Sequence, residues 1–292
     1  RLVRTASATL DFEQSRAEGI NASANTLCRQ CELELEQKMS KALVKRLVRN
    51  MISVSVLRKR RRWLIERQRA SNAKKSIHEV FGEIYDRGLW GRGDSRSPCS
   101  GSGSSLTVSE EYCETVRSFI RKNQIRSVLD IGCGDFEVGR YLRVPGVKYI
   151  GVDIVPWLIE RNKKLYEDEE TKFYCLDAIK DPLPDADLCL VRQVLQHLSN
   201  SQIMEMLQRL SKFNYIIVTE HYPSNIDRCV ANLDKPHGPD TRVPDGSAVF
   251  VDRPPFDLYP SFLLVNTVLS KPLDRKGETI RTFLLTPSDE LV

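Results

Sequence analysis

The sequence predicts an α/β fold, a doubly wound and mostly parallel sheet that follows a helical extension. Strand and helix signals alternate over residues 126–292, which is typical of a parallel sheet covered by helices on both faces. A glycine-rich turn follows the first strand, and an acidic residue ends each of the next two. Residues 1–75 differ from this pattern in charge. We therefore expect a basic, helical or partly disordered extension at 1–75 and an α/β domain at 76–292.

Basic residues are concentrated in the extension. Residues 41–75 hold thirteen Lys or Arg and one acid, Glu66, for a net charge of +12, whereas the whole chain of 292 residues carries +5. The pattern is helical from about residue 32 to 69, with an apolar stripe at Leu43, Leu47, Met51 and Val54. Contact with RNA, an anionic membrane surface or a partner helix would each suit this segment. A solvated or poorly ordered helix is the interpretation that we favour, because charge runs usually face water.

The composition indicates a globular protein with a buried core. Hydrophobic residues make up 41% of the chain and charged residues 28%. The sequence has no apolar run near the ~20 residues that a membrane span needs. Cys28 and Cys31 form a single CxxC without a second ligand pair at a suitable spacing, so we expect no metal site. Other cysteines lie in or beside apolar runs, which favours a reduced, cytoplasmic protein. The sequence assigns no oligomeric state.

Residues 76–125 lead into the sheet. An aromatic stretch ends at Trp90, and a Ser/Gly-rich run follows at residues 95–105. This run is either a flexible linker or a loop that covers a ligand, because glycines let backbone N–H groups come close to a bound group. A helix is expected from about Val108 to Lys122.

Seven strands are expected in the α/β domain, the last two as a hairpin. Helices are expected to begin near Glu137 and at Pro156, since proline favours a first helical turn, and another covers Ser201–Lys212. The Pro-rich segment 222–257 is expected to be a long loop. The strands are Ser127–Ile131, Lys148–Val152, Lys172–Leu176, Leu188–Val191, Tyr215–Thr219, Ser261–Leu269 and Thr279–Leu285.

The clearest functional signal lies at the carboxyl ends of the first three strands. Asp130 lies near the end of the first strand, and Gly132 and Gly134 in the following turn leave room for a ligand against the backbone. The next helix would direct its N–H groups at that ligand. Asp153 ends the second strand, where an acid can bind both hydroxyls of a ribose. Asp177 ends the third strand, where it can meet an adenine edge.

A dinucleotide is the alternative ligand, and the glycine spacing argues against it. The dinucleotide fingerprint places its glycines at spacings of two and three residues. Gly132, Gly134 and Gly139 are spaced by two and five residues, and Glu137 stands where the third glycine would be.

Residues 127–221 resemble the class I S-adenosylmethionine-dependent methyltransferases. Asp130, Gly132 and Gly134 match the first motif of that family, although Phe136 stands where many members have a third glycine. The wider stretch 81–260 is similar to bacterial-type members of unassigned substrate, which share its Tyr-x4-Trp-Gly, its Ser/Gly loop and a late Pro254-Pro255-Phe256. The resemblance implies a Rossmann-like, seven-stranded sheet with S-adenosyl-L-methionine as cofactor. The cofactor-binding residues that it implies are Asp130, Gly132, Cys133, Gly134, Asp153, Ile154, Asp177, Ala178 and Arg192.

The methyl acceptor is expected to be a small molecule or a glycan, methylated at oxygen. Residues 192–198 contain neither the Asn/Asp-Pro-Pro-aromatic motif nor the Pro-Cys pair of DNA methylases. His197 is the first candidate for a general base and His221 the second, and a packing or capping role for His197 is equally open. Two alternatives remain: an RNA or protein methyltransferase that docks through 41–75, and a catalytically idle cofactor-fold partner protein. The candidate acceptor-binding residues are Trp90, Glu220, Asn232, Asp234 and Arg242.

Overall fold

The computed structural model describes residues 54–91, 98–257, 261–269 and 277–285. The chain divides into two units, Arg1–Glu66 and Arg67–Val292, and each is described by itself. In the first unit the described part is the beginning of α2 (Val54–Asn72), which continues into the second. The Cys28–Cys31 pair and most of the expected apolar stripe, up to Met51, lie outside the described residues.

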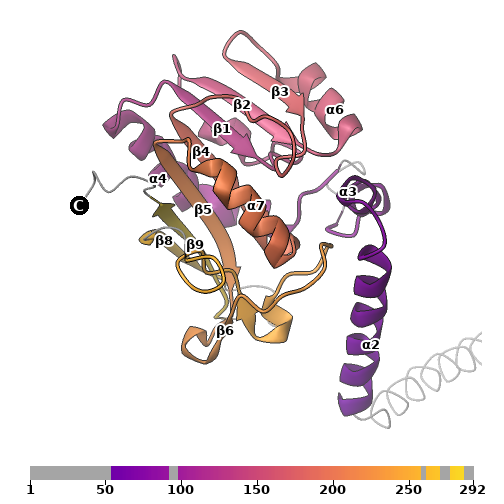
Figure 1. Ribbon diagram of the computed structural model, residues 1–292. Coiled ribbons are helices and arrows are strands. Elements are labelled where there is room, and N and C mark those ends of the chain that lie inside the picture. The colour runs from indigo at the N-terminus through magenta and orange to yellow at the C-terminus, as the bar shows by residue number, and fades with distance from the viewer. Residues whose placement is uncertain (1–53, 92–97, 258–260, 270–276, 286–292) are drawn as a thin grey trace, which may run out of the picture. The chain divides into compact units, whose positions relative to one another are not determined.

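The second unit contains a seven-stranded sheet with helices on both faces, as predicted (Figure 1). The strand order is β3-β2-β1-β4-β5-β9-β8; the first five are parallel, and β9 runs antiparallel to β5 and β8. The strands are β1 (Ser127–Ile131), β2 (Lys148–Asp153), β3 (Thr171–Cys175), β4 (Leu188–Arg192), β5 (Tyr215–Tyr222), β8 (Ser261–Val268) and β9 (Thr279–Leu285). The helices are α3 (Ile77–Arg87), α4 (Leu106–Lys122), α5 (Gly139–Leu142), α6 (Pro156–Tyr166) and α7 (Asn200–Leu210).

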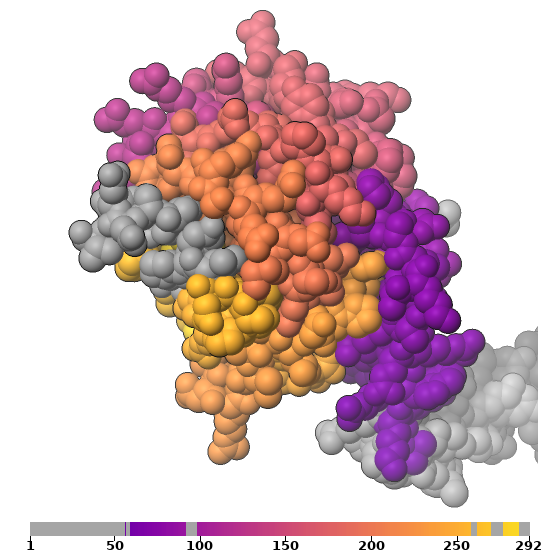
Figure 2. All heavy atoms as spheres, viewed as in Figure 1, coloured from indigo at the N-terminus to yellow at the C-terminus, as the bar shows by residue number. Residues whose placement is uncertain are grey.

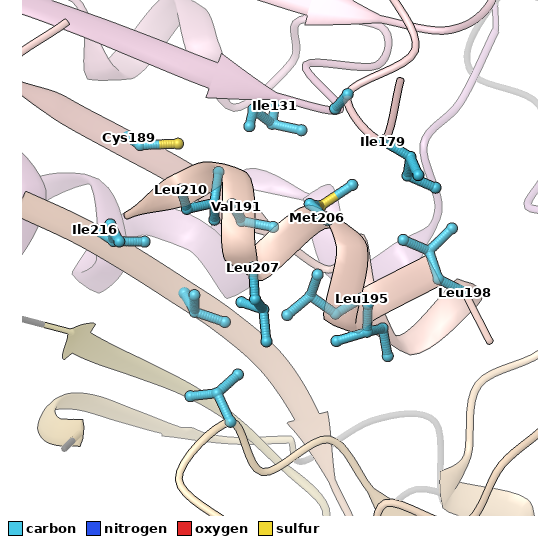
Figure 3. Close-up of a cluster of buried hydrophobic side chains, with 14 of the residues drawn as sticks. Ile131, Ile179, Cys189, Val191, Leu195, Leu198, Met206, Leu207, Leu210 and Ile216 are labelled. Atoms are coloured by element: carbon cyan, nitrogen blue, oxygen red, sulfur yellow. The ribbon is translucent and has the colours of Figure 1, made fainter. Parts of the chain in front are cut away.

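The sheet separates two apolar clusters. Successive residues of a strand point to opposite faces, so Val128 packs with the cluster that contains α4, whereas Leu129 packs with the cluster that contains α7. In Figure 3, Leu207 and Leu210 of α7 lie among strand side chains such as Ile131, Cys189 and Ile216. Both faces of β1 and β4 are therefore covered, which explains their nearly continuous apolar sequence.

Local sequence signals set several helix starts. Ser199 caps α7 and forms a capping box with Gln202, and Ser76 does the same for α3 with Glu79. Pro156 occupies the first turn of α6, as predicted. None of the helices in the described ranges combines the length and the apolar character of a bilayer-spanning segment.

The helix expected to begin near Glu137 begins two residues later, at Gly139, and has only four residues. Phe136 adopts a left-handed backbone conformation (φ +64°), and Asp135 Oδ1 accepts a hydrogen bond of 3.2 Å from the Glu137 N–H. These features hold a turn before α5 can begin at Gly139. A left-handed conformation at a residue other than glycine leaves no trace in the hydrophobic pattern, so the sequence did not indicate this turn.

The segment 222–257, predicted as a loop, contains the two-stranded sheet of β6 (Val230–Ala231) and β7 (Ser247–Ala248). Its 3-10 turns are η4 (Ile226–Arg228) and η5 (Val243–Asp245). Its apolar residues Val249, Val251 and Phe256 join the core cluster of α7. The space-filling view accordingly shows this segment and α7 as one continuous surface (Figure 2).

Candidate functional site

A pocket lies at the carboxyl ends of β1, β2 and β4 and beside the turn after β3, the edge at which doubly wound sheets bind ligands. Most of the residues predicted for the cofactor line this pocket, together with Trp90 and His197. The predicted cofactor residues in its wall are Asp130, Gly132, Cys133, Asp153, Ile154, Asp177, Ala178 and Arg192.

The glycine turn after β1 is shaped by the protein's own loops. Gly132 (φ +73°) and Gly134 (φ +55°) both have left-handed backbones. A Cβ on Gly132 would lie 2.4 Å from Val194 Cγ2, and a Cβ on Gly134 would lie 2.3 Å from Ser100 Oγ. From the sequence, this space was expected to hold a ligand. In the structure the two glycines also let Val194 and Ser100 pack against the turn.

Two buried acids stand beside the glycine turn. Asp153 accepts hydrogen bonds of 3.0 Å from the N–H groups of Gly134 and Val155, one on each carboxylate oxygen. Asp130 accepts a bond of 2.6 Å from the hydroxyl of Tyr149. Burial raises the pKa of each acid to about 6. Each carboxylate oxygen can accept a further hydrogen bond, so Asp153 retains capacity for ligand hydroxyls.

Asp177 and Arg192 each bring to the pocket wall a polar atom that makes no hydrogen bond within the described part of the chain. Asp177 Oδ1 accepts from the Ile179 N–H, but its buried Oδ2 has no donor. Arg192 Nη2 donates to the Gly103 carbonyl at 2.7 Å, but its buried Nε has no acceptor. A buried polar atom without a partner is costly. An adenine amine at Asp177 and a carboxylate at Arg192 would satisfy both, so the wall fits S-adenosylmethionine.

The described part of the Ser/Gly loop, residues 98–105, packs on the protein and is not a free linker. The Ser100 N–H donates to Asp135 Oδ2 at 2.9 Å, and the Asp135 N–H donates to Ser100 Oγ at 3.0 Å. Ser100 and Ser104 line the pocket. Gly103 packs so closely on Gln193 that an added Cβ would lie 2.2 Å from the Gln193 amide oxygen. The loop therefore closes over the ends of β1 and β4.

Trp90 also covers the pocket, on the side formed by aromatic residues, which we call the aromatic side. Its indole Nε1–H donates to the Pro239 carbonyl at 3.0 Å. Its ring centroid lies 4.8 Å from that of His197 and 5.4 Å from that of Tyr85. Phe81 packs against both Trp90 and His197.

His197 is buried in the pocket wall as a neutral imidazole. Its Nδ1 lies 3.1 Å from the Gly238 carbonyl, a contact that requires the proton on Nδ1, and this leaves Nε2 as the acceptor beside Gln196 Nε2 at 3.3 Å. Burial, assisted by the nearby charge of Lys235, lowers the pKa of His197 to about 3. His197 can accept a hydrogen bond at neutral pH, but it is a weak base.

The remaining candidates from the sequence do not line the pocket. Glu220 accepts from the N–H groups of Leu195 and Gln196 at 2.9 and 3.1 Å and so braces the loop after β4. His221 Nε2 lies 2.8 Å from Glu278 Oε2, beside β9.

The three polar candidates of the segment 222–257 are occupied in the scaffold. Arg242 is 1% exposed and donates to the carbonyls of Leu195, Gln196, Leu198 and Leu233. Asn232 donates to the Phe250 carbonyl at 2.8 Å and accepts from its N–H at 2.7 Å. Asp234 accepts from the Asn200 N–H at the start of α7. Their acceptor-binding role stays a prediction.

Comparison with known proteins supports the cofactor assignment. A family profile described as a methyltransferase domain matches residues 129–218, which span β1 to β5. No curated protein matches the chain.

The chain is also similar to solved structures, at low sequence identity. One is the N-methyltransferase NodS from Bradyrhizobium japonicum WM9 with S-adenosyl-L-homocysteine (13% identity, 72% of this chain, 100% of that one, TM-score 0.48). A second is magnesium protoporphyrin IX methyltransferase ChlM from Synechocystis PCC 6803 with S-adenosylmethionine (13% identity, 74% of this chain, 99% of that one, TM-score 0.47). A third is human N-acetylserotonin methyltransferase (17% identity, 73% of this chain, 60% of that one, TM-score 0.44). At this level of similarity they assign no substrate.

Proposed function

Since residues 129–218 form a methyltransferase domain whose methyl donor is S-adenosylmethionine, we propose that the chain methylates a small molecule or a glycan. The observation that carries this proposal is that the Ser/Gly loop and Trp90 cover the pocket. Trp90, Ser100 and Ser104 line the same pocket as Asp130 and Asp153. A covered pocket favours an acceptor that can be enclosed, whereas a polymer needs an open groove across the cofactor.

The residues of this chain would bind the donor in three places. Asp153 would accept hydrogen bonds from the ribose hydroxyls, Asp177 Oδ2 would accept from the adenine amine, and Arg192 Nε would donate to the methionine carboxylate. When bound, the cofactor supplies a methyl group on a sulfonium, which is an electrophile without further activation. The protein then contributes mainly by positioning the acceptor in line with the donor.

The acceptor side of the pocket is assigned to His197, Trp90 and Gln193. Gln193 follows β4 directly, has a left-handed backbone (φ +55°) and carries a buried Nε2 without a hydrogen bond in the described residues. This amide would donate to an acceptor oxygen, and His197 Nε2 would exchange its 3.3 Å contact with Gln196 Nε2 for the hydroxyl of the acceptor. We retain oxygen as the acceptor atom, with His197 orienting the hydroxyl rather than deprotonating it fully, because its pKa of about 3 makes it a weak base.

The test uses S-adenosylmethionine labelled in the methyl group. The purified chain is incubated with small-molecule, glycan, RNA and protein fractions of a cell extract. The proposal expects base-stable label in the small-molecule or glycan fraction, as an ether would give. Label confined to RNA or protein would contradict the acceptor class. Cofactor binding without transfer to any fraction would favour an idle partner protein.

A further inference from the structure

The first unit presents a helical segment whose cations surround the helix. Lys59, Arg60, Arg61 and Arg62 of α2 are all exposed. Successive helical residues are rotated by about 100°, so these four side chains point to different sides of the helix. The acid in this stretch, Glu66, lies 3.1 Å from Arg62, and both are well exposed (58% and 83%). Such a pair is weak, so the segment retains a strong positive field.

Apolar residues of the same segment are also exposed. Trp63 is 55% exposed and Leu64 48%. They adjoin the cations in sequence and do not gather on an opposite face. A helix that lies in a membrane surface needs charged and apolar faces that are clearly separated, and a helix that docks in a protein groove needs one apolar face. Neither condition is met by residues 59–66.

We propose that residues 59–66 of α2 bind a single-stranded polynucleotide. Phosphates that follow one strand can contact cations on several sides of a helix, and the exposed indole of Trp63 offers a surface on which a base can stack. The charge of the chain favours a polyanion at this place, because residues 41–75 carry +12 while the remainder carries −7. This role is separate from methyl transfer, since the polynucleotide is held and not methylated.

The test measures binding of fluorescein-labelled single-stranded oligouridine to the full chain by fluorescence anisotropy, at several salt concentrations. The variant Lys59→Gln/Arg60→Gln/Arg61→Gln removes three cations and keeps good helix formers. A matched control, Arg121→Gln/Lys122→Gln/Lys164→Gln, removes three exposed cations from α4 and α6. Affinity for S-adenosylmethionine, measured in parallel, verifies that each variant remains folded.

We expect the first variant to bind oligouridine at least about tenfold more weakly and the control to bind it nearly as the wild type does. The slope of log K against log salt should fall by about 2, since each phosphate contact on a single strand contributes roughly 0.7. Trp63→Leu should weaken binding about tenfold through lost stacking. A single-stranded DNA arm tests whether the sugar matters, and binding of either single strand supports the proposal.

Four results would overturn it. Equal losses in the variant and the control would indicate a general charge effect. Unchanged binding by Trp63→Leu, or equal affinity for a duplex, would remove the single-strand assignment. Binding to vesicles of phosphatidylcholine and phosphatidylserine without binding to oligouridine would make the segment a membrane contact. None of these results bears on the methyl acceptor.

Discussion

Burial changes the ionisation of the groups around the pocket in opposite directions. The pKa values of Asp130 and Asp153 are raised to about 6, whereas that of His197 is lowered to about 3. In each case the loss of water disfavours the charged form. A bound sulfonium would favour the two carboxylates, since a nearby positive charge stabilises an anion. Donor binding should therefore be weaker below pH 6 than at pH 7.

Asp153 is the residue with which we test the donor site. Asp153→Ala removes a charge-assisted contact to the ribose and should weaken S-adenosylmethionine binding by ~1.5–3 kcal/mol. Isothermal titration calorimetry measures this loss. Asp153→Asn is the matched control for shape, because it keeps one acceptor oxygen but loses the charge, and it should show an intermediate loss. Unchanged affinity in a folded Asp153→Ala chain would contradict the assignment.

His197 should make the stability of the protein depend on pH. The unfolded chain binds a proton at His197 near pH 6.5, whereas the folded chain binds it only near pH 3. The stabilising contribution of the neutral imidazole is therefore complete above pH 6.5 and is lost as the pH falls toward 3, by roughly 1.4 kcal/mol per unit.

Urea unfolding at pH 7 and pH 5 measures this effect. The wild type should lose about 2 kcal/mol more than His197→Asn between these two pH values, as the linkage relation requires. If the two proteins lose the same free energy, His197 is not the group responsible. A turnover assay on the same variant, once an acceptor is known, should show a small loss if His197 orients the acceptor and a loss of about 10²–10⁴ if it is the general base.

At the scale of elements, the Ser/Gly loop should respond to the donor. Ser100 and Asp135 hold the loop on the glycine turn, and Ser104 lines the pocket. A ligand beneath this loop adds contacts, so limited proteolysis between Ser100 and Ser105 should slow when S-adenosylmethionine is added. Cleavage at the exposed turn near Asn225, which is not among the residues that line the pocket, serves as the control. Equal rates with and without the donor would favour a plain linker.

Elements with a regular pattern were predicted well from the sequence. The limits of β1 and β9 agree with those predicted, and α7 differs by one residue at its start and two at its end. The carboxyl ends of β1, β2 and β4 and the turn after β3 meet in one pocket because parallel strands end at the same edge, so the acids and glycines at the ends of the predicted strands could be expected to lie together. The short α5 could not be predicted, since it depends on the left-handed backbone of Phe136.

Polar residues on irregular segments were harder to interpret. Arg242 and Asn232 resemble ligand contacts in the sequence, but in the structure they bond to backbone groups far away along the chain. Backbone carbonyls leave no signature in the sequence, so such partners cannot be identified from it. Ser100, Asp135 and Gln193 were missed for the related reason that loop closure brings them to the pocket. The sequence held one sign of this arrangement, Gly103, because the Gln193 side chain leaves no room for a larger residue at that position.

For the whole molecule, the question is where the α/β domain begins, because this determines which residues it needs in order to fold. The change in charge along the sequence predicts this boundary between residues 75 and 76. The structure divides the chain after Glu66. Within the second unit, Arg69 lies 2.5 Å from both Asp240 and Asp245, and Asn72 is 6% exposed. Residues 67–75 thus contact the segment that carries Gly238 and Pro239.

The ion pairs of Arg69 are more buried than ordinary surface ion pairs. Its side chain is 19% exposed, and the two carboxylates raise its pKa against the opposing effect of burial. Asp240 adjoins Pro239, whose carbonyl accepts from Trp90, and lies near Gly238, whose carbonyl contacts His197. The last turn of α2 should therefore support the aromatic side of the pocket.

A pair of truncated chains tests this arrangement. A chain that begins at Arg67 should unfold at the same urea concentration as the full chain, whereas one that begins at Ser76 should fold but lose about 1–2 kcal/mol, the usual contribution of partly buried charged hydrogen bonds. Full-length Arg69→Ala is the matched control and should lose a similar amount. Because Pro239 and Gly238 hold Trp90 and His197 but not Asp153, both losses should leave donor affinity nearly unchanged. If the chain from Ser76 does not fold at all, residues 67–75 are part of the core, and if it is as stable as the chain from Arg67, the Arg69 ion pairs contribute nothing.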